Sequence, residues 1–144
     1  MERITFITYS KIFWVLLLLF CIRVSAQLLV YFLEIPFLPS FEHWHSDSIP
    51  YSVLVMSQLI IIVVMSNVAL KFSRVQIVAN RRMGSWLIMM GGAYCLFMLL
   101  RLIISVAELS EHDWWDQPIP SVFHLVLAFF VIVVGQFHYR FGQK

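Results

Sequence analysis

Charged residues are scarce in this sequence. Only 12% of the 144 residues are charged, whereas 61% are hydrophobic, and the mean hydropathy is +0.86. Soluble domains carry about 25% charged residues, so this composition excludes an ordinary soluble protein and indicates an integral membrane protein. The net charge of +2 is too small to indicate nucleic-acid binding, and we expect no nucleic-acid partner.

Cysteine is almost absent, and the sequence motifs of familiar enzymes are missing. Cys21 and Cys95 both lie inside apolar runs, and no CxxC pair occurs, which argues against a disulfide framework or a thiol-redox enzyme. The sequence contains no phosphate-binding loop, nucleophile elbow or HExxH zinc motif. We therefore assign no catalytic residue and favour a protein that is not an enzyme.

Four long apolar runs dominate what is present. A bilayer core of about 30 Å needs about 20 apolar residues in helical form, because a spanning segment must satisfy its own backbone hydrogen bonds. The predicted membrane helices cover residues 12–33, 51–70, 85–107 and 119–137. The sequence thus predicts an all-α integral membrane protein, a bundle of four transmembrane helices that forms a single membrane domain over residues 1–144.

The first apolar run has an alternative interpretation as a cleaved secretory signal. Lys11 precedes the stretch IFWVLLLLFCI, and the small residues of Val24-Ser25-Ala26 stand before Gln27, as at a cleavage site. However, the apolar run resumes directly after this site with LLVYFL. We therefore interpret residues 12–33 as the first membrane helix.

The two signs of charge are separated along the chain. Lys and Arg outside the apolar runs lie at both ends and in the middle connection, at Arg3, Lys11, Lys71, Arg74, Arg81, Arg82, Arg140 and Lys144. The acids of the other two connections and their edges are Glu34, Glu42, Asp47, Glu108, Glu111, Asp113 and Asp116. Because basic loops stay in the cytoplasm, we predict a multi-pass protein of the cell membrane with both termini cytoplasmic.

The two acidic connections also resemble each other. Residues 44–50 read WHSDSIP and residues 114–120 read WWDQPIP, so each contains Trp and ends in Ile-Pro at a predicted helix start. Proline is common at a first helical turn, which makes the Ile-Pro match weak by itself. Arg23 and Arg101 occupy similar places in the first and third helices. Together these matches favour two tandem helical hairpins related by a pseudo-two-fold axis along the membrane normal.

The two arginines define a candidate ligand site in the outer half of the bundle. Along their helices, Arg23 lies about 16 Å from Glu34 and Arg101 about 10 Å from Glu108, so neither is at a membrane surface. A buried polar residue in a bilayer is costly and often functional, although arginine can also extend to the surface or serve packing alone. The predicted ligand-binding residues are Arg23, Gln27, Gln58, Arg101, Glu108 and His124.

Histidines in the outer connections form a second, metal-binding hypothesis. His43 and His45 make a His-x-His pair, and His112 lies in the other acidic connection. Imidazole and carboxylate groups are ligands for zinc, copper and iron, although loops near headgroups also gather them for interfacial reasons. A b-type haem is not expected, because His124 and His138 lie near opposite ends of the fourth helix.

Two functional classes follow from these residues. We favour a non-enzymatic membrane subunit or module that binds a lipid, a quinone or another polar ligand in an outer-leaflet pocket around Arg23 and Arg101. The alternative is an electron-transfer or oxidoreductase component that uses a quinone in that pocket or a metal held by the histidine-bearing loops. In either case the expected partners are the lipid bilayer and other membrane subunits or further copies of the chain.

Overall fold

The computed structural model describes residues 2–33, 51–107 and 118–143. These residues form four helices, α1 (Glu2–Leu33), α2 (Tyr51–Ser73), α3 (Arg81–Val106) and α4 (Pro118–Phe141). Each contains a segment long and apolar enough to cross a membrane. The predicted all-α bundle of four membrane helices is therefore confirmed. Each helix is longer than the apolar run that predicted it, although α3 ends one residue before its predicted end.

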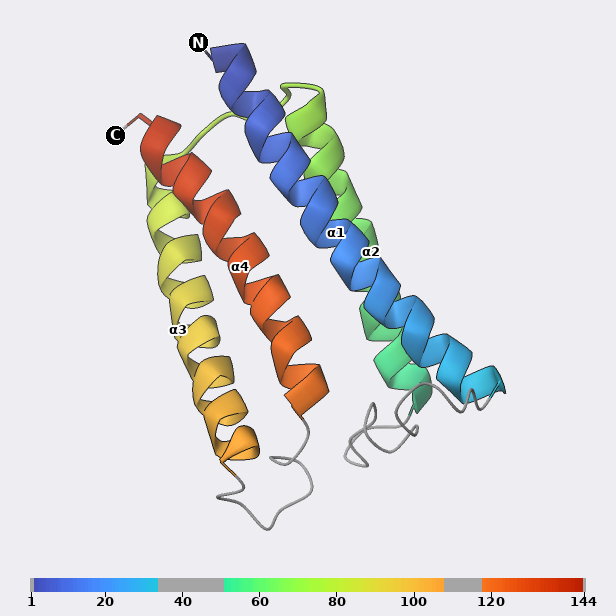
Figure 1. The fold of residues 1–144 in the computed structure, drawn as a ribbon. Coiled ribbons are helices and arrows are strands. Elements are labelled where there is room, and N and C mark those ends of the chain that lie inside the picture. Colours follow the sequence, from blue (N-terminus) through green and yellow to red (C-terminus); the bar gives the residue numbers. More distant parts are fainter. Residues whose placement is uncertain (1, 34–50, 108–117, 144) are drawn as a thin grey trace.

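The four helices form two antiparallel hairpins, α1 with α2 and α3 with α4 (Figure 1). Both chain termini and the connection from α2 to α3 lie at the same end of the bundle, which we call the basic end because Lys11, Lys71, Arg74, Arg82 and Arg140 lie near it (Figure 1). The two hairpins meet mainly through α1 and α4. The pseudo-two-fold relation between them stays a prediction.

Buried positions recur every seven residues on the helices. The repeats are Ser10, Leu17 and Val24 with Phe13, Phe20 and Gln27 on α1, Gln58, Met65 and Phe72 on α2, Gly84, Gly91, Met98 and Ser105 on α3, and Ser121, Ala128 and Gly135 on α4. A seven-residue repeat keeps one seam of a helix against its neighbour and produces left-handed packing. The bundle is thus built like a short coiled coil whose remaining faces are apolar and exposed.

Glycine allows α3 and α4 to approach closely. A Cβ atom added to Gly84 would overlap the backbone of Tyr139, and one added to Gly135 would lie 2.9 Å from the backbone nitrogen of Ile88. Small residues at a membrane-helix interface let backbones come together and gain dispersion energy. The α3–α4 hairpin is consequently the most closely packed pair in the described part of the chain.

An aromatic cluster holds α1, α2 and α4 together near the basic end. The ring centroids of Phe13 and Phe72 are 4.5 Å apart, and those of Phe72 and Phe137 are 4.7 Å apart. Phe6 and Tyr9 join the cluster from the first turns of α1, with centroids 5.0 and 5.2 Å from Phe137. This packing explains why α1 begins ten residues before the predicted position, since its polar first turns carry aromatic residues on their inner face.

The connection between the hairpins is tied to α4. Val75 has a φ of 56°, and the amides of Val75 and Gln76 bond the carbonyls of Phe72 and Lys71, so α2 ends in a Schellman motif with valine where glycine is usual. The Asn80 side chain then caps α3 by accepting from the amide of Met83. The backbone amide of Asn80 donates to His138 Nδ1 at 3.1 Å, which anchors the start of α3 to the end of α4.

Candidate functional site

Two polar side chains of α1 are buried one helical turn apart. Arg23 is 7% exposed and Gln27 is 1% exposed. Gln58 of α2 is 3% exposed, and its Nε2 donates a hydrogen bond of 2.9 Å to Oε1 of Gln27. The same face of α1 that packs phenylalanines near the basic end thus carries polar groups toward the other end, as the spacing of four residues predicts.

Helix α4 closes this polar region from the second hairpin. The guanidinium carbon of Arg23 lies 5.6 Å from the centroid of the Phe123 ring, within cation–π range. A cavity of about 60 Å³ lies between α1, α2 and α4, and its polar lining comes from Arg23, Ser57, Gln58 and His124. The site therefore forms at the contact between the two hairpins.

The second buried arginine is linked to the site through an aromatic pair. Tyr94 of α3 shares a hydrogen bond of 2.5 Å with Nδ1 of His124, so α3 fixes the orientation of the imidazole. Arg101 is 3% exposed and interacts electrostatically with Tyr94. Both Arg23 and Arg101 act electrostatically on His124. His124 consequently lies in a region of positive potential.

Several buried polar atoms at this site lack a hydrogen-bond partner in the described part of the chain. They include Nε of Arg23 and Nε2 of Gln27. Buried polar atoms are normally bonded to protein or water, because an unmade hydrogen bond in a dry site costs about 1 to 3 kcal/mol. The single described acidic residue, Glu2, begins α1 at the basic end. Both atoms are N–H donors, so the site is complementary to an oxygen acceptor.

The size of the cavity limits what can enter it. A water molecule occupies at least about 10 to 15 Å³ by this measure, so a cavity of about 60 Å³ has room for a few waters or for one small polar group. It is too small for a whole phospholipid headgroup or a quinone ring. A larger ligand would place one oxygen-bearing end in the cavity and keep the rest outside it.

The structure brings together five of the six predicted ligand-binding residues. Arg23, Gln58 and His124 line one cavity, Gln27 bonds Gln58, and Arg101 is near enough to His124 to act on it electrostatically. The remaining residue, Glu108, lies outside the described residues, as do the predicted metal ligands His43, His45 and His112. Within residues 2–33, 51–107 and 118–143, no group of three or more His, Cys, Asp or Glu side chains could hold a metal ion.

Tyr94 and Phe123 belong to the site but were not predicted from the sequence. Tyr94 stands seven residues before Arg101 and four before Met98, on the face of α3 that carries its buried residues. That spacing is a usable signal, because positions separated by four and seven residues share a helix face. Phe123 has no comparable signal, since α4 contains aromatic residues on several faces.

No protein-family model, curated protein or solved structure matches this chain. A four-helix bundle by itself is compatible with many functions. The function must therefore be argued from the side chains of the site.

Proposed function

We propose that the protein is a multi-pass membrane protein that binds the oxygen-bearing end of an amphipathic ligand at Arg23, between its two helical hairpins. The ligand's apolar part lies in the surrounding lipid. Both termini face the cytoplasm in this proposal, so the site opens toward the outer leaflet of the cell membrane.

The exposed surface of the helices supports the membrane location. Large apolar side chains such as Leu18, Ile22, Ile60, Met90 and Leu96 are each 57 to 62% exposed. In water such extended apolar faces would favour aggregation, whereas in a bilayer they contact lipid tails. A ligand with an apolar tail can therefore reach the hairpin contact from the membrane.

A single observation carries the binding proposal. Arg23 is buried within the membrane-spanning part of α1, it lines a cavity, and its Nε has no hydrogen-bond partner in the described residues. An arginine at such a depth costs about 2.5 to 3.5 kcal/mol on insertion scales. An acceptor bound in the cavity offsets this cost by bonding the guanidinium.

The lining determines the chemistry of the ligand. Arg23 supplies charged donors and the imidazole of His124 adds a polar contact, while Gln27 Nε2 is a further donor nearby. Guanidinium and amide donors bind phosphate, carboxylate and carbonyl oxygens. The ligand is accordingly an anionic lipid, a fatty acid or a quinone, whose shared feature is an acceptor oxygen on an apolar tail.

The polar groups of the lining favour binding over catalysis. The Ser57 hydroxyl donates to the Leu54 carbonyl of its own helix, and His124 Nδ1 bonds Tyr94. Neither group is arranged as a nucleophile with its base. We therefore describe the protein as a ligand-binding membrane module that acts alone or as a subunit.

Mass spectrometry of compounds that co-purify with the chain tests this proposal. The wild type should retain an amphipathic compound with an acceptor oxygen in near-stoichiometric amount. A double variant, Gln58→Leu with His124→Phe, removes two polar groups of the site from α2 and α4 and should lose most of that compound.

The matched control is Asn67→Leu with Gln136→Leu, which removes two exposed polar side chains from the same two helices and should retain the compound. Equal retention by both double variants, or no such compound in the wild type, would contradict the proposal. Stoichiometric metal or a visible chromophore in place of the compound would support the electron-transfer alternative.

A further inference from the structure

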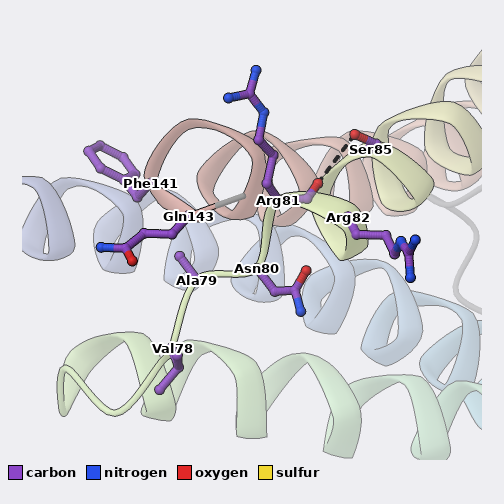
Figure 2. A pocket seen from close by; sticks show the side chains of 8 residues that line it. All are labelled: Val78, Ala79, Asn80, Arg81, Arg82, Ser85, Phe141 and Gln143. Atoms are coloured by element: carbon purple, nitrogen blue, oxygen red, sulfur yellow. Dashed lines mark hydrogen bonds between the residues drawn. The ribbon is translucent and has the colours of Figure 1, made fainter.

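The basic end of the bundle contains a large cavity that is separate from the Arg23 site. The cavity has a volume of about 870 Å³ and lies where the α2–α3 connection, the start of α3 and the end of α4 meet. Figure 2 shows the eight side chains that line it, which include Arg81, Arg82, Asn80 and Gln143. Ligand pockets typically have volumes of about 300 to 1,000 Å³, so this cavity can hold a complete polar headgroup.

The two arginines of the cavity differ in their contacts. The guanidinium of Arg81 lies 4.8 Å from the centroid of the Tyr139 ring, and its Nη2 is 3.4 Å from the Tyr139 hydroxyl. Arg82 is exposed, and the two guanidinium groups extend in different directions from the first turn of α3 (Figure 2). Arg81 is thus held in place by α4, whereas Arg82 is available to fold over a bound group.

The cavity also has an apolar side. Val78 is 88% exposed and Phe141 is 42% exposed, and both line it. The membrane-spanning segments of α3 and α4 begin at Arg81 and end at Phe141, and Trp86, 59% exposed, follows within two turns. Exposed aromatic residues at the end of a span mark the level of the lipid headgroups. The cavity therefore lies where headgroups and the first part of the acyl chains meet.

A second cavity at the same end repeats this composition on the other hairpin. It has a volume of about 370 Å³ and is lined by the basic residues Lys11 and Arg74 and by the hydroxyls of Ser10 and Ser73. These hydroxyls bond each other at 2.7 Å. Each hairpin therefore presents two cationic side chains beside a cavity at the level of the headgroups.

We propose that the Arg81–Arg82 cavity binds the phosphate headgroup of an anionic phospholipid in the leaflet beside the basic end. In this arrangement Arg82 donates hydrogen bonds to the phosphate, and Arg81 adds positive charge from a position fixed by Tyr139. Val78 and Phe141 contact the start of the acyl chains. Arginine pairs well with phosphate because its planar donors match two oxygens at once. The apolar residues favour a lipid over a free phosphate ion.

A lipid titration of the full-length chain in detergent tests this assignment. Phosphatidylglycerol and phosphatidylcholine with the same acyl chains are added separately, and bound lipid is counted by native mass spectrometry. The wild type should bind phosphatidylglycerol more tightly. Each arginine that contacts the phosphate directly should contribute about fivefold in affinity, so Arg81→Gln with Arg82→Gln should weaken phosphatidylglycerol binding by more than about tenfold. Phosphatidylcholine binding should weaken by a much smaller factor, because the choline ammonium already balances the charge of its phosphate.

The matched control is Lys71→Gln with Arg140→Gln, which removes the same charge from the same end at residues that do not line this cavity. It should change phosphatidylglycerol affinity by less than about threefold. The single variant Arg82→Gln, at an exposed residue, should lose affinity about fivefold without a change in melting temperature, so that binding is separated from folding.

Three results would overturn the assignment. Equal losses of phosphatidylglycerol affinity in the two double variants would indicate a diffuse charge effect. Unchanged affinity in the Arg81/Arg82 variant would show that the lipid does not bind in this cavity. Full displacement of phosphatidylglycerol by equimolar inorganic phosphate would show a free-anion site. All these outcomes are independent of the ligand at Arg23, because the two sites share no lining residue and the Arg23 site lies away from the basic end.

Discussion

Gln58 donates a hydrogen bond of 2.9 Å to Gln27, and both side chains are almost fully buried. This bond joins α2 to α1 at the level where Arg23 lines the cavity, at the end of the hairpin away from the aromatic cluster. It is the hydrogen bond between α1 and α2 in the polar half of their contact.

Breaking this bond from one side should destabilise the protein. Gln58→Leu leaves Oε1 of Gln27 buried without its donor, and measured polar couplings between membrane helices average about 0.6 kcal/mol with a maximum near 1.7. The double variant Gln27→Leu with Gln58→Leu should recover part of the loss, because no polar group is then left unbonded. A double-mutant cycle of unfolding in detergent measures the coupling. A coupling of zero would mean that the bond does not stabilise the hairpin.

Two glycines of α3 should respond in opposite ways to alanine. Gly84→Ala places a methyl group against the backbone of Tyr139, so it should lower the unfolding free energy by about 1 to 3 kcal/mol. Gly92 has no atom within 4 Å of an added Cβ, and Gly92→Ala should be neutral or stabilising by up to about 1 kcal/mol, because alanine favours helix. Melting temperatures of the two variants make the comparison. Similar effects at both positions would contradict the close packing of α3 on α4.

The charge distribution predicts the orientation of the chain in intact cells. A reporter fused after Lys144 should be active in the cytoplasm, and cysteines introduced at Ser46 and Gln117, in a background without Cys21 and Cys95, should react with an impermeant reagent added outside. The reason is that basic segments resist translocation across the membrane. Labelling of either position only after the cells are opened would reverse the topology and place the Arg23 site in the inner leaflet.

Much of the fold was predictable because hydrophobic length is a strong signal for membrane helices. The apolar runs at 12–33 and 119–137 underestimated the lengths of α1 and α4. The outer turns of these two helices mix polar with aromatic residues and so do not read as apolar. Those turns are helical because Phe6 and Tyr9 pack on Phe137. Such contacts join residues more than a hundred positions apart, and hydropathy along the chain carries no information about them.

The site was predictable in its residue types but not in its pairing. The spacing of four places Arg23 and Gln27 on one face of α1 from sequence alone. The sequence does not reveal the two pairings of the site. The residue of α2 that meets Gln27 depends on the rotation of the helices, and the bond between Tyr94 and His124 depends on how α3 packs against α4. Glu108 was included from its distance along the helix to Arg101, and it lies outside the described residues.

The thermal stability and bound-ligand content of Arg23→Leu test the central claim most directly. If Arg23 binds a ligand, the variant should lose the co-purifying compound and melt at the same or a higher temperature, because a costly buried charge has been removed. A purely structural arginine predicts a different result, in which the variant misfolds or loses stability and a second change, Gln27→Leu or Glu34→Gln, partly restores it. That result, or an Arg23→Leu protein with unchanged ligand content, would contradict the proposed site.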